Sequence, residues 1–342
     1  MFKTFEMELA GRKLVIETGK MAKQASGAVL VRYGDTVVLV TSTISKEARE
    51  GTDFFPLTVD YEEKMYAVGK MPGGFLRREG RPGNSAILNA RLIDRPIRPL
   101  FDKRCRHDVH VVATVLSVEQ DNAPELCGML GASASLAISN IPWDGPIAGV
   151  RVGCVDGQYV INPTQEQLAA SSMNITVAGS ETAILMVEGG AKEVPEEQVL
   201  DAIMFGHEAI KKLVAFQKQI VAEAGKPKME LVFPEIPADI EQAIHDYAAG
   251  PLKDAIFNPD KLTREAHMAE VRKEAEEHFK EIYPDNAADV DACLDHLTKS
   301  IVRHMISVDK IRPDGRALDE IRPITCEVGL LPRVHGSALF TR

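Results

Sequence analysis

Residues 64–106 read KMYAVGKMPGGFLRREGRPGNSAILNARLIDRPIRPLFDKRCR and separate the strand-like segments on either side of them. This stretch holds eleven lysines and arginines and three acids, whereas the whole chain of 342 residues has a formal net charge of -10. A positive segment inside an acidic protein concentrates the electrostatic field in one place. The stretch therefore predicts contact with a polyanion, and a nucleic acid is the first candidate.

The first part of this stretch, residues 69–83, has the composition of an exposed loop. Its five glycines and two prolines exclude a helix or a central strand. Phe75 stands among Arg77, Arg78 and Arg81, so the loop offers an aromatic face for a base and forked donors for phosphates. Single-stranded RNA requires both. The competing interpretation is a solvated, charged surface loop.

The second part predicts a helix over residues 86–94 that carries arginines on one face. The residues expected to cap and to stop this helix are Asn84 or Ser85, then Pro96 and Pro99. The arginines at i, i+4 and i+7 spacing, if the helix reaches the last of them, are Arg91, Arg95 and Arg98. Asp94 could pair with one of these arginines, and part of the row would then be a structural ion-pair network.

Length and composition indicate a chain of two or more domains. The hydrophobic content of 45% is enough for sizeable cores, and the sequence has neither a run of 18 apolar residues nor a signal peptide. The five cysteines are scattered and form no CxxC pair, which predicts a reduced, cytoplasmic protein that contacts no membrane.

Two groups of residues could be considered as metal ligands. Cys105, His107 and His110 are close in sequence, but on an extended segment the two histidines point to opposite faces. Asp60, Glu62 and Glu63 could hold a divalent ion, although a solvated strand end explains them more simply. We therefore expect no metal at either place.

The order of the elements predicts an α+β fold followed by an all-helical module. The expected strands are residues 5–9, 14–17, 28–32, 36–42, 55–61, 109–118, 147–154, 159–161, 173–178 and 183–188. The expected helices of the first part are residues 123–139, a short one after a capping box at Thr164 and Gln167, and 195–223. The predicted domains are residues 1–225, a linker at 226–237, a helical domain at 238–309, and a new strand-like segment at 310–342.

Two of these segments invite further predictions. The helix at 123–139 is rich in small residues, which let a helix lie close against a sheet. Asn122 and Glu125 have capping-box spacing, so this helix start should satisfy its own amides and bind phosphate poorly. The helical module carries sixteen acids against eight bases, a balance that argues against a nucleic-acid role and for a spacer or packing role.

The end of the chain repeats its beginning. Glu17-Thr18-Gly19 followed by Gly27-Ala28-Val29-Leu30-Val31 matches Glu327-Val328-Gly329 followed by Gly336-Ser337-Ala338-Leu339-Phe340. The offset is 310 residues for the first segment and 309 for the second. Because the second copy stops within its strand, we expect this chain to be a fragment of a longer protein with two copies of one fold.

The chain resembles one family closely along its whole length, the bacterial polyribonucleotide nucleotidyltransferases. The segments that carry the resemblance are residues 54–61 (FFPLTVDY), 69–101, 188–197, 311–316 (IRPDGR) and 335–342 (HGSALFTR). The resemblance implies a first RNase PH-like domain (the ribosomal protein S5 domain 2-like fold), an all-helical domain and the truncated start of a second RNase PH-like domain. In the family these are followed by two RNA-binding domains.

The same resemblance implies a reaction and its partners. The family degrades single-stranded RNA by processive 3′-to-5′ phosphorolysis to nucleoside diphosphates, with phosphate as co-substrate and Mg²⁺ or Mn²⁺ as cofactor. It works as a homotrimer and is associated with components of the RNA degradosome. The family's channel loop, two aromatics followed by two arginines, falls on Phe75-Leu76-Arg77-Arg78, where Leu76 replaces one aromatic.

The family's catalytic residues are not found in this chain. An aspartate and a lysine two apart precede Val-Ala-Gly in the catalytic domain, but here Asn174 and Thr176 stand before Val177-Ala178-Gly179, with Leu168 in place of an upstream aspartate. Asn174 is neutral and Thr176 carries no charge for a phosphoryl transition state. The family's serine-rich phosphate site corresponds to Pro124-Glu125-Leu126-Cys127, where Glu125 should repel phosphate.

Three hypotheses follow. The chain is the non-catalytic half of an RNA phosphorylase, inactive alone, with no catalytic residue and no metal ligand of its own. Alternatively, it acts by itself as a single-stranded RNA-binding module. In the third reading it is a scaffold, with arginines in subunit ion pairs and an acidic helical domain that docks partners.

Overall fold

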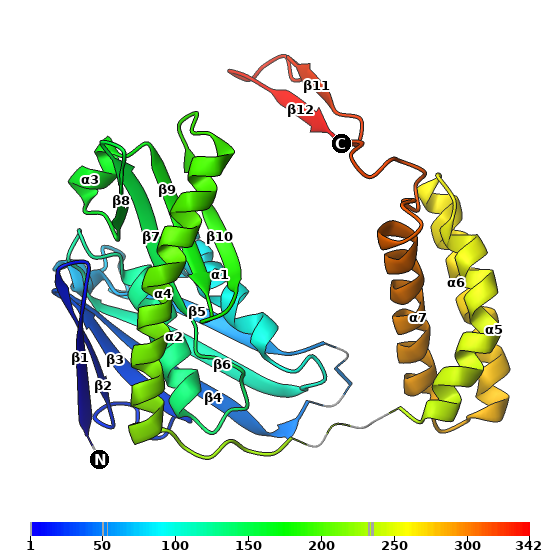
Figure 1. The fold of residues 1–342 in the computed structure, drawn as a ribbon, viewed down its shortest axis with the longest axis horizontal. Coiled ribbons are helices and arrows are strands. Elements are labelled where there is room, and N and C mark those ends of the chain that lie inside the picture. Colours follow the sequence, from blue (N-terminus) through cyan, green and yellow to red (C-terminus); the bar gives the residue numbers. More distant parts are fainter. Residues whose placement is uncertain (1, 50, 53, 232, 234–235) are drawn as a thin grey trace. The chain divides into compact units, whose positions relative to one another are not determined.

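The computed structural model describes residues 2–49, 51–52, 54–231, 233 and 236–342. The chain forms two compact units, Met1–Phe233 and Pro234–Arg342, each of which is described by itself (Figure 1). The predicted linker at 226–237 includes Val232, Pro234 and Glu235, which lie outside the described residues. None of the helices in the described ranges is long and apolar enough to cross a membrane.

The first unit contains a six-stranded sheet in the order β1-β2-β3-β4-β6-β5. Its strands are β1 (Lys3–Leu9), β2 (Arg12–Thr18), β3 (Gly27–Tyr33), β4 (Thr36–Ala48), β5 (Leu57–Glu63) and β6 (His107–Ser117). Neighbours run antiparallel except β5 and β6, which are parallel. Alternate β-branched residues of β3, β4 and β6, such as Val31, Val40 and Val111, are fully buried on one face of this sheet.

A second, antiparallel sheet of four strands has the order β10-β9-β7-β8. Its strands are β7 (Ala148–Val155), β8 (Gln158–Ile161), β9 (Met173–Gly179) and β10 (Ile184–Ala191). The short helix α3 (Gln165–Ala170) joins β8 to β9 and begins at the predicted capping box of Thr164 and Gln167, which is confirmed. The four strands lie where the alternation of apolar residues predicted them.

Helix α2 (Pro124–Ile138) forms the centre of the first unit. It contacts β3, β4 and β6 of the larger sheet and β7 of the smaller one, and every residue from Leu126 to Ile138 is buried. A Cβ atom at Gly131 would lie 2.4 Å from Cγ2 of Val40, too close for any side chain. The predicted close approach of this helix to a sheet is therefore confirmed.

Helix α4 (Glu196–Ala224) covers β7 and β9 and also contacts α2 (Figure 1). Gly206 permits the approach, since a Cβ there would lie 2.9 Å from Val152. His207 of this helix is buried, and its Nε2 lies 3.0 Å from the carbonyl of Ser180. His207 is thus a packed residue.

Two predictions about helix ends were wrong. Helix α1 (Asn84–Ile97) has Gly83 as its N-cap with no side-chain cap, and Pro96 lies inside the helix instead of stopping it. The final turn is retained because Ile93, Pro96 and Ile97 are buried together, and the chain then continues into a short 3-10 helix, η2 (Arg98–Leu100).

The predicted capping box of α2 is also absent. Ala123 is the N-cap, and no side chain caps this helix. The side chain of Asn122 instead donates to Glu119 (2.5 Å) and accepts from Arg12 (2.7 Å). Glu125 forms an ion pair with Arg151 at 2.7 Å. Each side chain thus has an arginine partner that is distant in the sequence, Arg12 for Asn122 and Arg151 for Glu125.

The second unit begins with three helices, α5 (Ala238–Ile256), α6 (Lys261–Ile282) and α7 (Ala287–Ser307). Their shared core includes Ile244, Leu252, Phe279 and Leu294. Arg272 of α6 joins α7 through Asp291 and Asp295, the latter at 2.6 Å. The helical module predicted at 238–309 has its own small core.

The unit ends in a two-stranded hairpin, β11 (Thr325–Val328) and β12 (Ala338–Thr341), whose residues are all exposed. In the first unit, Glu17 pairs with Leu30 and Thr18 with Val29. In the hairpin, Glu327 pairs with Leu339 and Val328 with Ala338. The register of the two hairpins is therefore the same across the offsets of the sequence repeat. Each copy also has a glycine of positive φ directly after its first strand, Gly19 (84°) and Gly329 (71°).

Candidate nucleic-acid interface

The loop at 69–83 is anchored at its middle. It follows a short 3-10 helix, η1 (Met65–Val68), and leads into α1. The carboxylate of Glu79 accepts a hydrogen bond from the backbone N–H of Met65 (2.7 Å) and lies 3.6 Å from Lys64 Nζ. Lys64 also pairs with Glu62 at 2.6 Å, which raises the pKa of this lysine above its usual value. Glu79 thus ties the loop to the end of β5.

The tip of this loop is a turn with an apolar corner. The backbone N–H of Arg77 donates to the carbonyl of Gly74 at 3.0 Å, and Arg77 itself has a positive φ of 51°. Phe75 at the corner is 100% exposed and Leu76 is 74% exposed. Because Phe75 makes no packing contact that would hide its ring, both ring faces are open to a stacking partner.

Four of the predicted arginines have free guanidinium groups. In the described ranges, no hydrogen bond or ion pair involves the side chains of Arg77, Arg78, Arg81 or Arg91. All four are exposed. Each can therefore offer its full set of donors to a phosphate without first breaking a bond within the chain.

The other two arginines of the predicted row are engaged. Arg98 grips Asp94 with two bonds, Nε at 2.8 Å and Nη2 at 2.6 Å, and also donates to the carbonyl of Leu57 at 3.0 Å. Arg95 pairs with Glu188 and so connects α1 to β10. The structural ion-pair alternative holds for Arg95 and Arg98, while Arg91 stays available.

Two adjoining cavities lie beside the loop and share Tyr61, Pro82 and Ala86. The first, of about 640 Å³, has Arg78 and Arg81 on its wall together with Glu62, Glu63 and Glu79. The second, of about 400 Å³, lies between α1 and β5 and is lined by residues that include Asp60, Arg91, Asp94 and Arg98. Acids and bases thus share these walls, and the free positive charge belongs to Arg78, Arg81 and Arg91.

The residues considered as metal ligands form no metal site. Nε2 of His110 lies 2.7 Å from Asp60, and His107 Nδ1 lies 3.1 Å from the carbonyl of Ser45. Cys105 is buried, and burial raises the pKa of its thiol. Across the residues that the structure describes, no group of three or more metal-ligating side chains occurs.

The place where the resemblance would put catalytic groups holds a structural ion pair. Thr176 and Asn174 on β9 lie opposite Arg151 and Gly153 on β7. Arg151 pairs with Glu125, and their side chains are only 19% and 15% exposed. Arg151 was missed by the sequence analysis, although the alternation of β7 puts it on the face opposite Val150 and Val152. Cys127 in the next turn of α2 is fully buried, which raises the pKa of its thiol to about 12.

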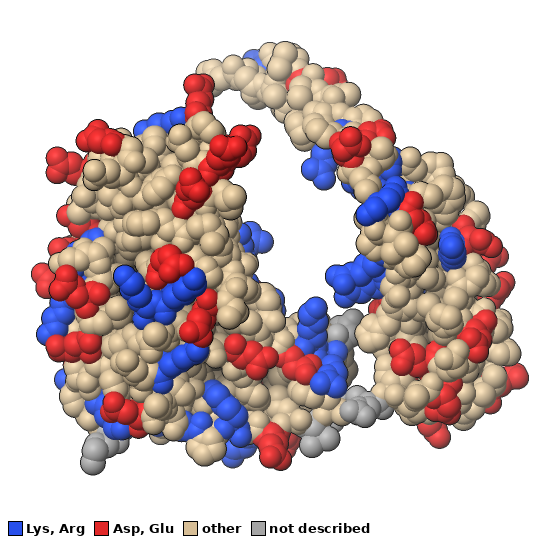
Figure 2. Space-filling model, viewed as in Figure 1, with Lys and Arg blue, Asp and Glu red and all other residues tan. Residues whose placement is uncertain are grey.

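Figure 2 shows acidic and basic side chains scattered over one face of the second unit, among residues that are mostly uncharged. Arg272, Lys261 and Lys273 of this unit are all paired with acids. These three bases of the helical module are therefore already neutralised within it.

Three family models match successive parts of the chain. Residues 10–142 match domain 1 of the 3′ exoribonuclease family, and residues 145–209 match domain 2. These two parts correspond to the larger and the smaller sheet of the first unit. Residues 239–317 match the RNA-binding domain of polyribonucleotide nucleotidyltransferase. The description of that third family differs from the spacer role that its charge predicts.

Curated relatives named polyribonucleotide nucleotidyltransferase match the chain along nearly its whole length. The protein of Heliobacterium modesticaldum is 60% identical over 99% of this chain, and that of Syntrophomonas wolfei is 55% identical over 99%. The chain spans about half the length of these relatives, 48% of each. The crystal structure of rice Rrp46 aligns with a TM-score of 0.48 and 15% identity over 65% of this chain and 94% of that one, a level too low to support further conclusions.

Proposed function

The chain belongs to the polyribonucleotide nucleotidyltransferase family, and from that membership we propose that it holds RNA in a phosphorolytic 3′-to-5′ exoribonuclease. The substrate is single-stranded RNA, phosphate is the co-substrate, and nucleoside diphosphates are the products. This chain supplies the contact with the RNA strand, while the catalytic residues belong to the part of the relatives that it does not span.

The observation that carries this proposal is the tip of the loop at 69–83. A fully exposed phenylalanine, Phe75, stands beside three arginines with free guanidiniums, Arg77, Arg78 and Arg81. A base can stack on the ring while the arginines bind the phosphates on either side, and neither contact depends on base identity. Arg91 extends the contact along α1, whereas Arg95 and Arg98 position the helix. A degradative enzyme needs such sequence-tolerant contacts.

The proposed inactivity of this chain rests on the Arg151–Glu125 pair. A divalent ion needs several oxygen ligands of negative charge, but Asn174 is neutral and Glu125 is already neutralised by Arg151. Thr176 is neutral and, as a whole residue, only 6% exposed. These residues do not fit Mg²⁺ or Mn²⁺, so we assign the metal of the complete enzyme to residues outside this chain.

The assembly of the complete protein follows from the same premise. The hairpin β11–β12 repeats the register of β2–β3, which supports a second copy of the fold after residue 310. We propose a cytoplasmic homotrimer that gathers three copies of the loop around one RNA strand, with degradosome components as further partners. The predicted domains, with boundaries at 225, 237 and 309, belong to this proposal.

A scaffold role is the second candidate, because Arg95 and Arg98 are structural ion-pair residues. Two measurements on the purified chain separate the candidates. Fluorescence anisotropy with a labelled oligoribonucleotide should give binding that weakens with salt, whereas a scaffold would not bind. Incubation with poly(A), phosphate and Mg²⁺ should yield no ADP. Steady ADP production that Asn174→Ala or Glu125→Ala abolishes would contradict the inactive-half assignment.

A further inference from the structure

The fold gathers lysines that are far apart in the sequence. Lys3 lies on β1, Lys20 and Lys23 lie in the loop between β2 and β3, and Lys226 and Lys228 follow α4. None of the five forms an ion pair with a carboxylate among the described residues. In an acidic chain, such a group of unpaired lysines is a second positive region that no sequence stretch reveals.

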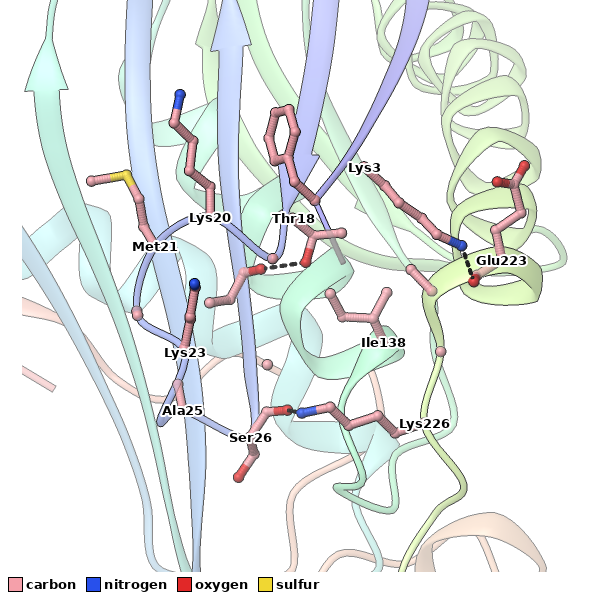
Figure 3. Close-up of a pocket in the computed structure, with 17 residues that line it drawn as sticks. Lys3, Thr18, Lys20, Met21, Lys23, Ala25, Ser26, Ile138, Glu223 and Lys226 are labelled. Carbon is pink, nitrogen blue, oxygen red and sulfur yellow. Dashed lines mark hydrogen bonds between the residues drawn. The ribbon is translucent and has the colours of Figure 1, made fainter.

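Four of these lysines line one cavity, shown in Figure 3. Its volume is about 700 Å³, and its walls also include Phe2, Met21 and Ile138. Glu223 is the one acid among its lining residues. Cavities of about 300 to 1,000 Å³ hold small-molecule ligands in proteins. The cavity therefore combines a ligand's volume with a surplus of positive charge.

Helix ends account for two of the five lysines. Lys3 Nζ donates to the carbonyl of Glu223 in the last turn of α4. Lys228 Nζ donates to the carbonyls of Leu136, Ala137 and Ser139 at the end of α2, at 2.8 to 3.0 Å. Cations are favourable at helix C-termini because the last carbonyls have no partners within the helix. Lys3 and Lys228 therefore have a structural role.

The remaining three lysines have no comparable role. Lys226 Nζ donates to one neutral acceptor, the carbonyl of Ser26, at 2.7 Å. Lys20 Nζ lies 5.5 Å from the ring centroid of Phe2. Lys23 is exposed and has no side-chain partner among the described residues. Each ammonium group keeps spare donors, and Figure 3 shows these lysines on the walls of the cavity.

We propose that this cavity binds a nucleoside diphosphate. Its two phosphates contact Lys20, Lys23 and Lys226, whose three positive charges balance about three negative charges on the diphosphate. Its base lies against Phe2, which is 48% exposed at the rim. A lysine ammonium is a point charge on a flexible side chain and imposes no fixed geometry on its partner. Such charges suit the freely rotating terminal phosphates of a nucleotide better than the phosphates of an RNA strand held in one position.

This site is separate from the loop at 69–83, so it goes beyond the proposed RNA contact. Strands β3 and β5 both run parallel to β6, because β4 is antiparallel to β3 and to β6. The loop follows the end of β5, whereas the cavity lies at the start of β3. The two places lie at opposite ends of parallel strands, and a strand of seven residues, at about 3.3 Å per residue, separates these ends by about 20 Å. One nucleotide cannot touch both.

Isothermal titration calorimetry of the whole chain with ADP, AMP and pyrophosphate tests this proposal. ADP should bind, and AMP should bind at least about tenfold more weakly because it lacks the second phosphate. Phe2→Ala should weaken the binding of ADP but not the binding of pyrophosphate. The double variant Lys20→Gln/Lys23→Gln should lose at least about tenfold in ADP affinity. The matched control Lys46→Gln/Lys299→Gln removes the same charge from exposed lysines elsewhere and should bind ADP like the unmodified chain.

Four results would overturn the proposal. Equal affinities for ADP and AMP would mean a general attraction of anions. Unchanged ADP binding by Lys20→Gln/Lys23→Gln, or no ADP binding at low salt, would remove the site. A loss of ADP binding in Arg77→Ala/Arg78→Ala instead would locate the phosphates at the loop. Because the lysine variant leaves the loop intact, failure of this site leaves the RNA contact to be tested separately.

Discussion

Replacement of Arg77 and Arg78 by alanine should separate phosphate contacts from base contacts at the loop tip. Both guanidiniums are free and exposed, so their removal should not unfold the chain. Each phosphate contact to a single strand contributes a slope of about 0.7 to the dependence of log affinity on log salt. If Arg77, Arg78 and Arg81 each bind one phosphate, the unmodified slope from this loop is about 2.1.

The magnitude can be worked through for a fourfold rise in salt, from about 50 to 200 mM. A slope of about 2.1 lowers RNA affinity about 18-fold, whereas the double variant, left with Arg81, should lose only about 2.6-fold. Phe75→Ala should weaken binding by about 1–3 kcal/mol, or about 5-fold to 150-fold, and leave the slope unchanged. Because Phe75 is fully exposed, its removal should also leave the melting temperature unchanged.

The assay is fluorescence anisotropy with labelled oligoribonucleotides of different sequence over several salt concentrations. The control Arg322→Ala/Arg333→Ala removes the same charge from two exposed arginines of the second unit, outside the segment that matches the RNA-binding domain, and should keep the slope. An unchanged slope in Arg77→Ala/Arg78→Ala, or an equal change in the control, would refute the phosphate contacts. If the chain alone does not bind RNA, the same substitutions in the longer protein decide, and unchanged binding there refutes the phosphate contacts.

Three further predictions follow. Glu79→Ala should expose the loop to trypsin several-fold more than Glu79→Gln, which keeps an acceptor for the amide of Met65; equal cleavage rates would contradict the anchoring role. Arg151→Met should cost about 3 kcal/mol in urea denaturation by leaving Glu125 buried without its partner, and adding Glu125→Leu should recover most of that loss; no recovery would contradict the pairing. With a pKa of about 12, only about one in ten thousand Cys127 thiols is ionised at pH 8, and this fraction grows as pH rises. Iodoacetamide should therefore label the exposed Cys326 and spare Cys127 until the chain unfolds, as mass spectrometry can check. Labelling of Cys127 in the native chain would contradict its burial.

Local signals in the sequence were sufficient for most of the fold. The capping box at Thr164 depends on residues three positions apart, and it was predicted correctly. The small residues of α2 indicated close packing against a sheet, and this signal too can be read from one short stretch of sequence. The glycines and prolines of residues 69–83 likewise predicted an exposed loop, and Phe75 and its neighbouring arginines lie at its exposed tip.

Two of the errors have the same physical cause, which is competition from distant side chains. Asn122 was expected to cap α2, but Arg12, 110 residues away, takes its carbonyl oxygen. The row of arginines on α1 was split because Glu188, 93 residues from Arg95, lies within reach once β10 is in place. Neither partner can be identified from spacing, and the same holds for the lysine cavity, whose walls come from both ends of the first unit.

The bond between Lys3 and the carbonyl of Glu223 has a topological consequence. It joins residues 220 positions apart and brings the start of β1 beside the end of α4. The backbone of the first unit is thus an almost closed ring with a gap that a few residues could bridge. Circular permutants, whose ends are joined at this gap and opened at the exposed Asp156-Gly157 turn, retain every strand pairing in principle. Where the chain happens to start is then incidental to this architecture, since the same set of contacts defines it from any exposed opening.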